Sequence, residues 1–325
     1  MFAIFSLIGV SLLMFIIVYT LPGDPATAAA GPGASPEQIE YMRQKLGLDK
    51  PLYQQYARFV WRLLHGDLGI STRTHRPVTT ELKERIPASF ELVFAAMLFL
   101  LLVSIPLGVF SALKPGGVID AIGRIVVALG MGMPIFWVGL VAQMILVGKL
   151  HLFPFGNRLG LTTLPPPSWT GFYVIDSLLS GDWATLKEAV YHLILPAIIL
   201  ALPELAVTTR LVRSSMLEVL DMDYVRTARA KGLPERTVLW KHALRNALIA
   251  PVTILGLQFG WMLGNTILIE RIFCWGGIGY FAVSSIYNRD FPMLNGIAFV
   301  MCLVFVVGNT IVDILYLILD PRVKY

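Results

Sequence analysis

The residues of this sequence that could do chemistry are few and scattered. There is no G-x-x-x-x-G-K-[ST] phosphate loop, and Gly276, Gly277 and Gly279 do not form a dinucleotide-binding fingerprint. A G-x-S-x-G elbow and an H-E-x-x-H helix are also missing, and Cys274 and Cys302 have no histidine at metal-ligand spacing. The histidines are far apart: His65, His75, His151, His192 and His242. We therefore expect no catalytic residue, no metal site and no cofactor site in this chain.

The most distinctive chemical feature is a basic, helix-prone stretch from Asp223 to Pro251, with apolar segments on both sides. The segment 223–231 favours a short helix, on which Ala228 and Ala230 would leave a face slim enough to enter a groove. Gly232 permits a left-handed turn, and Leu233-Pro234 starts a second helix that runs into the next apolar segment. Such a hairpin, rigidly joined to the next apolar segment, can transmit the movement of a bound partner protein to that segment. The alternative is an ordinary loop whose positive charge only sets its side of the membrane.

The composition places these residues in a membrane protein. Of the 325 residues, 56% are hydrophobic and 14% are charged, whereas about 25% are charged in a soluble domain. Five runs lack Asp, Glu, Lys and Arg, and each reaches the roughly 20 residues that cross a bilayer: 1–23, 92–113, 125–148, 246–269 and 291–312. A sixth run, 189–203, continues through Glu204 to Thr209. We predict an all-α integral membrane protein with six transmembrane helices.

The predicted parts are a first transmembrane helix at 1–21, an extracytoplasmic helical region at 22–88, a core of five transmembrane helices at 89–318 and a cytoplasmic tail at 319–325. The first run could instead be a cleaved signal ending at Ala26-Thr27-Ala28, but no basic residue precedes it. Basic residues concentrate in the loop 213–246 and the tail. The positive-inside rule therefore places this loop and both termini in the cytoplasm. The net charge of +5 follows the sides of the membrane and does not form a nucleic-acid-binding patch.

Several local patterns refine this plan. Ser35-Pro36-Glu37-Gln38 has the form of a capping box, and Gly47 can close the helix that it starts. The second span follows Pro87, and the third is interrupted at Gly130–Pro134. The proline-rich segment 149–188 is expected to form an irregular surface cap.

Two ionisable residues fall within spans, Glu204 and Asp313. They could serve an ion-driven carrier, but we favour hydrogen bonding to neighbouring helices, since no inverted repeat is evident.

The basic stretch resembles the cytoplasmic loop of ABC importer permeases, whose pattern is E-A-A, three residues, G, nine residues, I-x-L-P. Ala228, Gly232 and Leu244 match its second alanine, glycine and leucine. Departures from the general pattern are similar to the dipeptide, oligopeptide and nickel branch, at Arg226, Thr227, His242 and Arg245. Other segments resembling that branch's first permease subunit are 21–25, 46–52, 66–71, 133–137, 213–216 and 319–322. Gly276 differs, because the branch has proline there.

The resemblance implies one permease subunit of a type I ABC importer in a bacterial or archaeal inner membrane, with an extracytoplasmic insertion after the first span. It implies as partners a second homologous permease, two ATPase subunits that bind ATP-Mg, an extracytoplasmic substrate-binding protein and membrane lipid, but no nucleic acid. The chain itself would be no enzyme. The ATPase-coupling residues would be Tyr224, Arg226, Thr227, Ala228, Arg229, Ala230, Lys231, Gly232, Leu233 and Pro234.

The expected substrate is a di- or oligopeptide, with nickel or a metal chelate as the alternative. A secondary carrier or channel acting alone, or a receptor, is a more remote reading. Seven residues are candidates for the translocation pathway, although simple packing is the ordinary role of such side chains: Met131, Met133, Phe136, Trp137, Glu204, Trp261 and Asn265.

Overall fold

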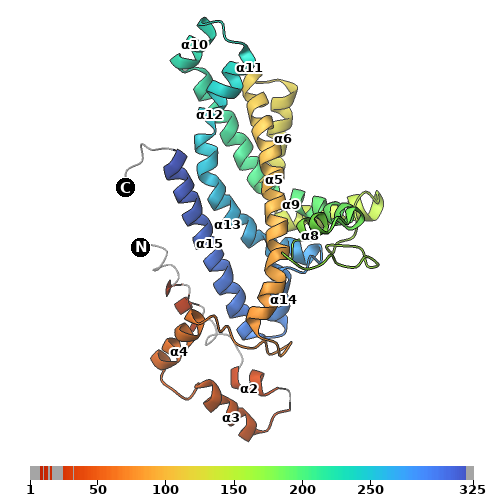
Figure 1. The fold of residues 1–325 in the computed structure, drawn as a ribbon, viewed down its shortest axis with the longest axis vertical. Helices are drawn as coiled ribbons and strands as arrows, with labels where there is room; N and C mark the ends of the chain where they lie inside the picture. Colours follow the sequence, from red (N-terminus) through yellow and green to blue (C-terminus); the bar gives the residue numbers. More distant parts are fainter. Residues whose placement is uncertain (1–7, 10, 14, 17–24, 32, 320–325) are drawn as a thin grey trace. The chain divides into compact units, whose positions relative to one another are not determined.

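The computed structural model describes residues 8–9, 11–13, 15–16, 25–31 and 33–319. Their regular secondary structure is helical throughout (Figure 1). The elements are α2 (Pro25–Ala30), α3 (Pro36–Leu46), α4 (Leu52–Leu64), α5 (Val78–Leu113), α6 (Val118–Gly132), α7 (Ile135–Ala142), the π-helical η1 (Gln143–Lys149), α8 (Tyr173–Ser180), α9 (Trp183–Leu220), α10 (Asp223–Ala230), α11 (Glu235–Thr237), the π-helical η2 (Val238–Ala243), α12 (Leu244–Ala247), α13 (Ile249–Ile272), α14 (Ile278–Tyr287) and α15 (Phe291–Leu319).

Within the described residues, four helices are long and apolar enough to cross a membrane: α5, α9, α13 and α15. A fifth span results if α6 and the α7–η1 segment count as one, although they are bent by 110° at the break after Gly132. The glycine and proline residues at 130–134 therefore interrupt a helix, as predicted. The predicted first span, 1–21, lies largely outside the described residues, so a total of six spans is still a prediction.

The described residues form two compact units, and α5 and α15 contribute to both. The first unit comprises the residues up to 89 together with 276–307. In it, the predicted capping box at Ser35 is complete, and Gly47 ends α3 with a φ of 72°. Its core joins the start of α5 to α14 and α15, through Val78, Leu82, Ile278, Ala282, Met293 and Ile297. The buried Asp290 accepts hydrogen bonds from Ser71, Thr72 and Met293 and so ties the loop before α5 to α15.

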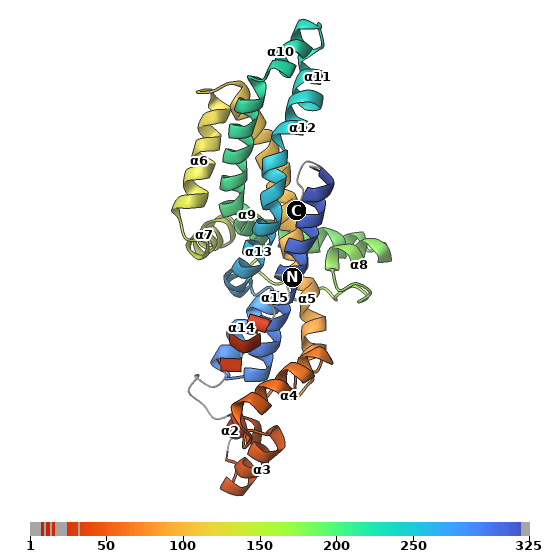
Figure 2. The same ribbon diagram turned by 90° about the vertical axis from the view of Figure 1, so that its left-hand side faces the viewer.

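The second unit, 90–275 with the end of α15, is built around α9. Figure 1 and Figure 2 show α6 and α13 running beside α9, with α10 and α11 at one end of α9. Glycines allow the close approach of these helices. A Cβ on Gly130 of α6 would lie 2.5 Å from the carbonyl oxygen of Leu202 and 2.9 Å from Cβ of Ala206. Gly108 of α5 is similarly close to Val212 of α9.

The segment between η1 and α9 is fixed to the helices by buried polar groups and forms an ordered cap, residues 150–182. Glu91 of α5 accepts hydrogen bonds from Arg158 Nη2 (2.6 Å) and from the Val174 amide (2.8 Å). Glu188 of α9 accepts from the Gly160 amide (2.8 Å) and from Thr163 Oγ1 (2.6 Å). These contacts join residues far apart in the sequence, so the cap is positioned by two spans at once.

Two sequence predictions need correction here. The segment 149–188 was expected to be irregular, but Lys149 ends η1, α8 lies inside the segment and its last residues belong to α9. Pro87 was expected to precede the second span, but it lies inside α5, which begins at Val78 within the predicted 22–88 region. A proline removes one backbone donor, but α5 continues through Pro87, with Leu82 and Ala88 buried before and after it.

The close approach of α6 to α9 predicts a difference between two glycine variants of α6. Gly130→Ala should lower the free energy of unfolding by about 1–3 kcal/mol, because the added methyl group meets a backbone oxygen that cannot move away cheaply. Gly132→Ala is the matched control, since, outside its own helix turn, no atom of the described residues lies within 4 Å of the position that its methyl group would occupy. The measurement is the melting temperature in detergent, taken as the temperature at which half of the protein is no longer monodisperse after heating. Equal melting temperatures would contradict the packing described.

Candidate functional site

The hairpin formed by α10, α11, η2 and α12, residues 223–247, is anchored in the second unit by an apolar cluster. The cluster combines side chains of α5 and α9 with side chains of η2 and α12: Val109, Ala112, Val212, Met216, Ala243, Leu244 and Ala247. All of them are buried. The root of the hairpin is thus part of the core of the membrane helices.

An ion pair next to this cluster joins α6 to α9, which carries part of the cluster. Arg213 Nε of α9 lies 2.8 Å from Oδ1 of Asp120, which is buried at the start of α6. Asp120 also accepts a hydrogen bond from the Gly116 amide (2.9 Å) in the turn between α5 and α6. A buried carboxylate is costly to leave unpaired, so this contact fixes the α5–α6 turn against α9.

The two arms of the hairpin are held together by a second, smaller core. Val225 and Ala228 of α10 pack against Val238 of η2, with Val219 and Leu220 of α9 beside them. Ala228 is therefore buried, whereas the sequence pattern placed it on the slim exposed face; Ala230 is on the exposed side. The predicted position of Ala228 on the slim face is wrong, because its partner, Val238, lies on the other arm of the hairpin and cannot be recognised from the local sequence.

Gly232 ends α10 in the predicted left-handed conformation, with a φ of 75°. The Gly232 amide donates to the carbonyl oxygen of Arg229 (2.9 Å) and the Leu233 amide to that of Ala228 (3.4 Å). This pair of bonds is a Schellman motif. Apart from its neighbours in sequence, no described residue lies within 4 Å of where a Cβ on Gly232 would be, so this position is constrained by its backbone angle and not by space.

Two polar contacts between the arms of the hairpin are exposed to solvent and therefore weaker. Asn246 Nδ2 donates to Tyr224 Oη (2.8 Å), and Arg229 Nη2 lies 2.8 Å from Glu235 Oε1. The hydrogen bond from Arg229 holds the pKa of Glu235 below its ordinary value of 4.5. The contact therefore stabilises the hairpin fully above pH 4.5 and is lost as the pH falls through the lowered pKa. Both side chains are about half exposed, so its contribution is about 1 kcal/mol or less.

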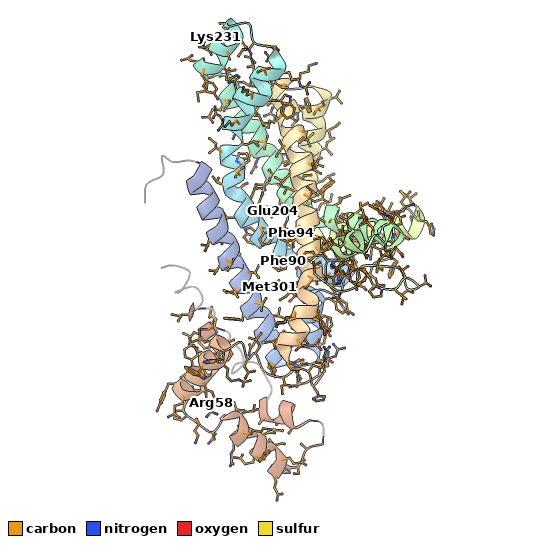
Figure 3. All side chains as sticks on the ribbon, in the orientation of Figure 1. Arg58, Phe90, Phe94, Glu204, Lys231 and Met301 are labelled. Carbon is orange, nitrogen blue, oxygen red and sulfur yellow. The ribbon has the colours of Figure 1, made fainter. Side chains whose placement is uncertain are left out.

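The surface that the hairpin offers to a partner is short and mostly polar. Figure 3 shows Lys231 at its tip. Of the ten residues predicted for ATPase coupling, only Ala228 is buried; the rest are exposed: Tyr224, Arg226, Thr227, Arg229, Ala230, Lys231, Gly232, Leu233 and Pro234.

The seven predicted pathway residues lie on four helices of the second unit. Met131 is on α6, Met133 is the residue that caps α6, and Phe136 and Trp137 are on α7. Glu204, labelled in Figure 3, lies near the middle of α9, and Trp261 and Asn265 lie on α13. Helices α7, α9 and α13 touch one another. Glu204 and Asn265 are half-buried, whereas the other five are exposed on this chain.

The structure adds a polar contact between two spans that was not predicted from the sequence. Gln258 of α13 is buried, and its Nε2 donates to Thr208 Oγ1 of α9 (2.8 Å) and to the backbone oxygen of Glu204 (3.4 Å). A glutamine within a charge-free run was the available signal. For the other ionisable residue predicted within a span, Asp313, the side chain lies outside the described part of the structure.

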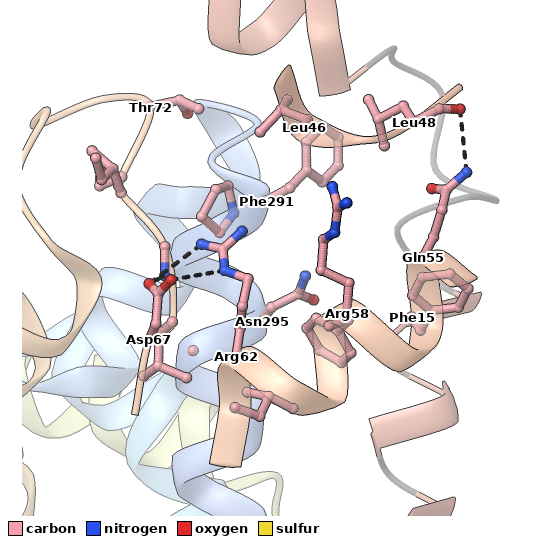
Figure 4. A pocket seen from close by; sticks show the side chains of 18 of the residues that line it. Phe15, Leu46, Leu48, Gln55, Arg58, Arg62, Asp67, Thr72, Phe291 and Asn295 are labelled. Atoms are coloured by element: carbon pink, nitrogen blue, oxygen red, sulfur yellow. Dashed lines mark hydrogen bonds and ion pairs between the residues drawn. The ribbon is translucent and has the colours of Figure 1, made fainter. Parts of the chain in front are cut away.

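A cavity of about 430 Å³ lies within the first unit, between α3, α4 and the start of α15. Its lining includes Arg58, Arg62, Phe291 and Asn295 (Figure 4). Arg62 is paired with Asp67 at 2.8 Å. None of the predicted pathway residues lines this cavity, and none of the sequence patterns pointed to it.

Comparison with known proteins decides the family. The profile of the binding-protein-dependent transport system inner membrane component matches residues 104–325, and the profile of the N-terminal part of such membrane components matches residues 1–93. The chain belongs to this family of ABC permeases. It is therefore a multi-pass inner membrane protein and a permease component of an ABC transport system, as the resemblance implied.

Relatives match the permease over almost its whole length. It is 46% identical over 315 residues to the probable D,D-dipeptide transport system permease of Escherichia coli (strain K12), with 97% of this chain and 93% of the relative covered. It is 42% identical over 323 residues to the dipeptide transport system permease of the same organism, covering 98% and 95%. The di/tripeptide transport system permease of Pseudomonas aeruginosa (strain UCBPP-PA14) is 46% identical over 319 residues, covering 98% and 94%.

The two alanines of α10 allow the inner and outer faces of the permease hairpin to be tested separately. Ala228→Leu should weaken the hairpin by about 1–3 kcal/mol, because the larger side chain overfills the space next to Val225 and Val238. Ala230→Leu, on the exposed side, should leave its stability unchanged. Amide hydrogen exchange over residues 223–247 measures the difference. Faster exchange in Ala230→Leu than in Ala228→Leu would show that the two faces are assigned the wrong way round.

Proposed function

We propose that this permease forms half of the translocation pathway of an ATP-driven importer of di- and oligopeptides and receives mechanical work from ATPase subunits through the hairpin 223–247. The proposal includes a second homologous permease, two ATPase subunits that bind ATP-Mg, and an extracytoplasmic substrate-binding protein. It also places both termini and the hairpin in the cytoplasm, and the 22–88 insertion on the other side.

The observation that carries the proposal is the way in which the hairpin is built. Its exposed tip, around Lys231, offers a small polar surface, while its root, Ala243, Leu244 and Ala247, is buried against α5 and α9. A partner that binds the tip therefore acts on a packed unit that includes the membrane helices. Because packed interiors do not deform continuously, movement of the tip is transmitted to the spans.

The coupling step follows from this geometry. ATP-driven closure of the ATPase pair would draw the two hairpins of a permease pair together. That movement favours one of two arrangements of the spans, which is a population shift between inward-facing and outward-facing states. The interruption between α6 and α7, and the exposed side chains Phe136, Trp137 and Trp261, supply the surface across which the second permease would complete the pathway.

The substrate assignment rests on the relatives. The names of the three relatives described above include dipeptide or di/tripeptide transport, which supports a peptide substrate over nickel or a nickel chelate. A carrier or channel acting alone is less well supported, because the family is one of binding-protein-dependent systems.

Two hairpin variants test the docking role of the tip. In Gly232→Val, a β-branched residue must adopt a positive φ, which distorts the turn; in Ala230→Leu, the turn is intact but the slim face is filled. We expect each to lower peptide uptake by about tenfold or more, equivalent to about 1.4 kcal/mol of lost coupling, while the ATPase subunits still hydrolyse ATP. Gly232→Asn is the control, since asparagine tolerates this conformation. Normal uptake by both variants in proteoliposomes would contradict docking at this surface.

Competition for uptake tests the substrate class. In proteoliposomes that contain the complete transporter and its binding protein, excess unlabelled di- and tripeptides should abolish uptake of a labelled dipeptide. Nickel chloride and a nickel–histidine chelate at the same concentration should leave it unchanged. ATP-dependent accumulation of radioactive nickel without peptide uptake would replace the peptide assignment by the metal one, without affecting the coupling mechanism.

A further inference from the structure

The cap, residues 150–182, has a surface that is unusually apolar for a segment outside the spans. From Leu159 to Ile175 it contains no Asp, Glu, Lys, Arg or His. Its next charged residue, Asp176, is buried and accepts hydrogen bonds from Thr170 and Gly171. Large apolar side chains are nevertheless exposed: Leu161 (95% exposed), Leu164 (83%), Trp169, Leu178, Leu179 and, at the start of α9, Trp183.

Such a surface needs an apolar partner. Burial of one leucine stabilises by about 1.5–3 kcal/mol relative to exposure to water, and contiguous apolar patches on proteins mark interaction sites with proteins or membranes. The cap itself is ordered, because Glu91, Glu188 and the Arg158 guanidinium, which lies 3.5 Å from the centre of the Tyr173 ring, hold it. The apolar side chains are therefore presented by a fixed scaffold.

The same carboxylates show the level at which the cap lies. Glu91 comes directly before the charge-free run 92–113 of α5, and Glu188 comes directly before the charge-free run 189–203 of α9. Both acids thus mark where a span leaves the hydrocarbon region. Since the cap is hydrogen-bonded to both of them, it lies at the membrane surface, whichever side of the membrane that is.

The cap also continues the apolar surface of a span. Phe94, Leu98 and Leu102 are spaced by four residues on α5, and all three are exposed. The ring of Phe94 packs against Phe172 of the cap, with 6.3 Å between the ring centres. In Figure 1 and Figure 2, α8 and the chain around it project sideways from the long helices of the second unit. The segment thus extends away from the helix axes at the level of the membrane surface, and its tryptophans are residues typical of that interface.

From these observations we infer that the cap is an interfacial membrane anchor: the side chains of Leu161, Leu164 and Leu179 insert among the lipid headgroups and upper acyl chains beside α5 and α9. The partner is lipid, because a docking surface for a water-soluble protein would carry a polar, charged rim, and the stretch 159–175 has no charge at all.

Spin-label accessibility tests the anchor in the complete transporter in lipid nanodiscs. After replacement of Cys274 and Cys302, single cysteines replace Leu161, Leu164 or Leu179, all exposed and therefore tolerant of labelling. We expect each label to be more accessible to oxygen than to a water-soluble nickel chelate. Leu102→Cys on α5 gives the reference for the membrane, and Glu37→Cys on the polar helix α3 gives the reference for water.

Each other outcome overturns the inference. Labels that meet the nickel chelate as readily as the Glu37 label would show that the cap lies in water. Labels shielded from both reagents would show that another subunit covers the cap, and a cross-link from Leu164→Cys to that subunit would identify it. Because three separate positions are labelled, a single misfolded variant does not decide the result.

Discussion

The structure depends on the packing of small and apolar side chains at the place where the hairpin 223–247 meets the membrane helices. Val109 and Ala112 of α5, Val212 and Met216 of α9, and Ala243 of η2 form one buried cluster. Because such an interior is close-packed, the hairpin cannot tilt without moving α5 and α9. The Asp120–Arg213 ion pair extends the same body to α6. Everything that we propose about coupling follows from this connection.

Two kinds of interaction stabilise the second unit: hydrogen bonds to carboxylates and close helix contacts at small residues. The carboxylates of Asp120, Glu91 and Glu188 are all near ends of apolar runs, where they tie a turn or the cap to a span. Glycines such as Gly130 bring the helices into contact between those ends. This arrangement suits a bilayer, because unpaired charge is expensive in the hydrocarbon region, whereas close contact between helices gains van der Waals energy there.

Features set by neighbouring residues could be predicted from the sequence: the capping box at Ser35, the left-handed Gly232 and the interrupted helix at 130–134. Features set by distant partners could not. The inward direction of Ala228 depends on Val238 on the other arm of the hairpin, and the order of the cap depends on Arg158 reaching Glu91, 67 residues away. The sequence thus predicted the turn of the hairpin but not which of its faces is buried, and the roles of the coupling and pathway residues are still predictions.

The most direct test of the central claim is a structure of the assembled transporter in its nucleotide-bound state. We predict that residues 224–234 lie in a groove of an ATPase subunit, with Ala230 and Lys231 in contact and Ala228 still turned toward Val238. A transport-competent assembly in which this tip touches no ATPase subunit, or in which the ATPase contacts only other parts of the permease, would contradict the account.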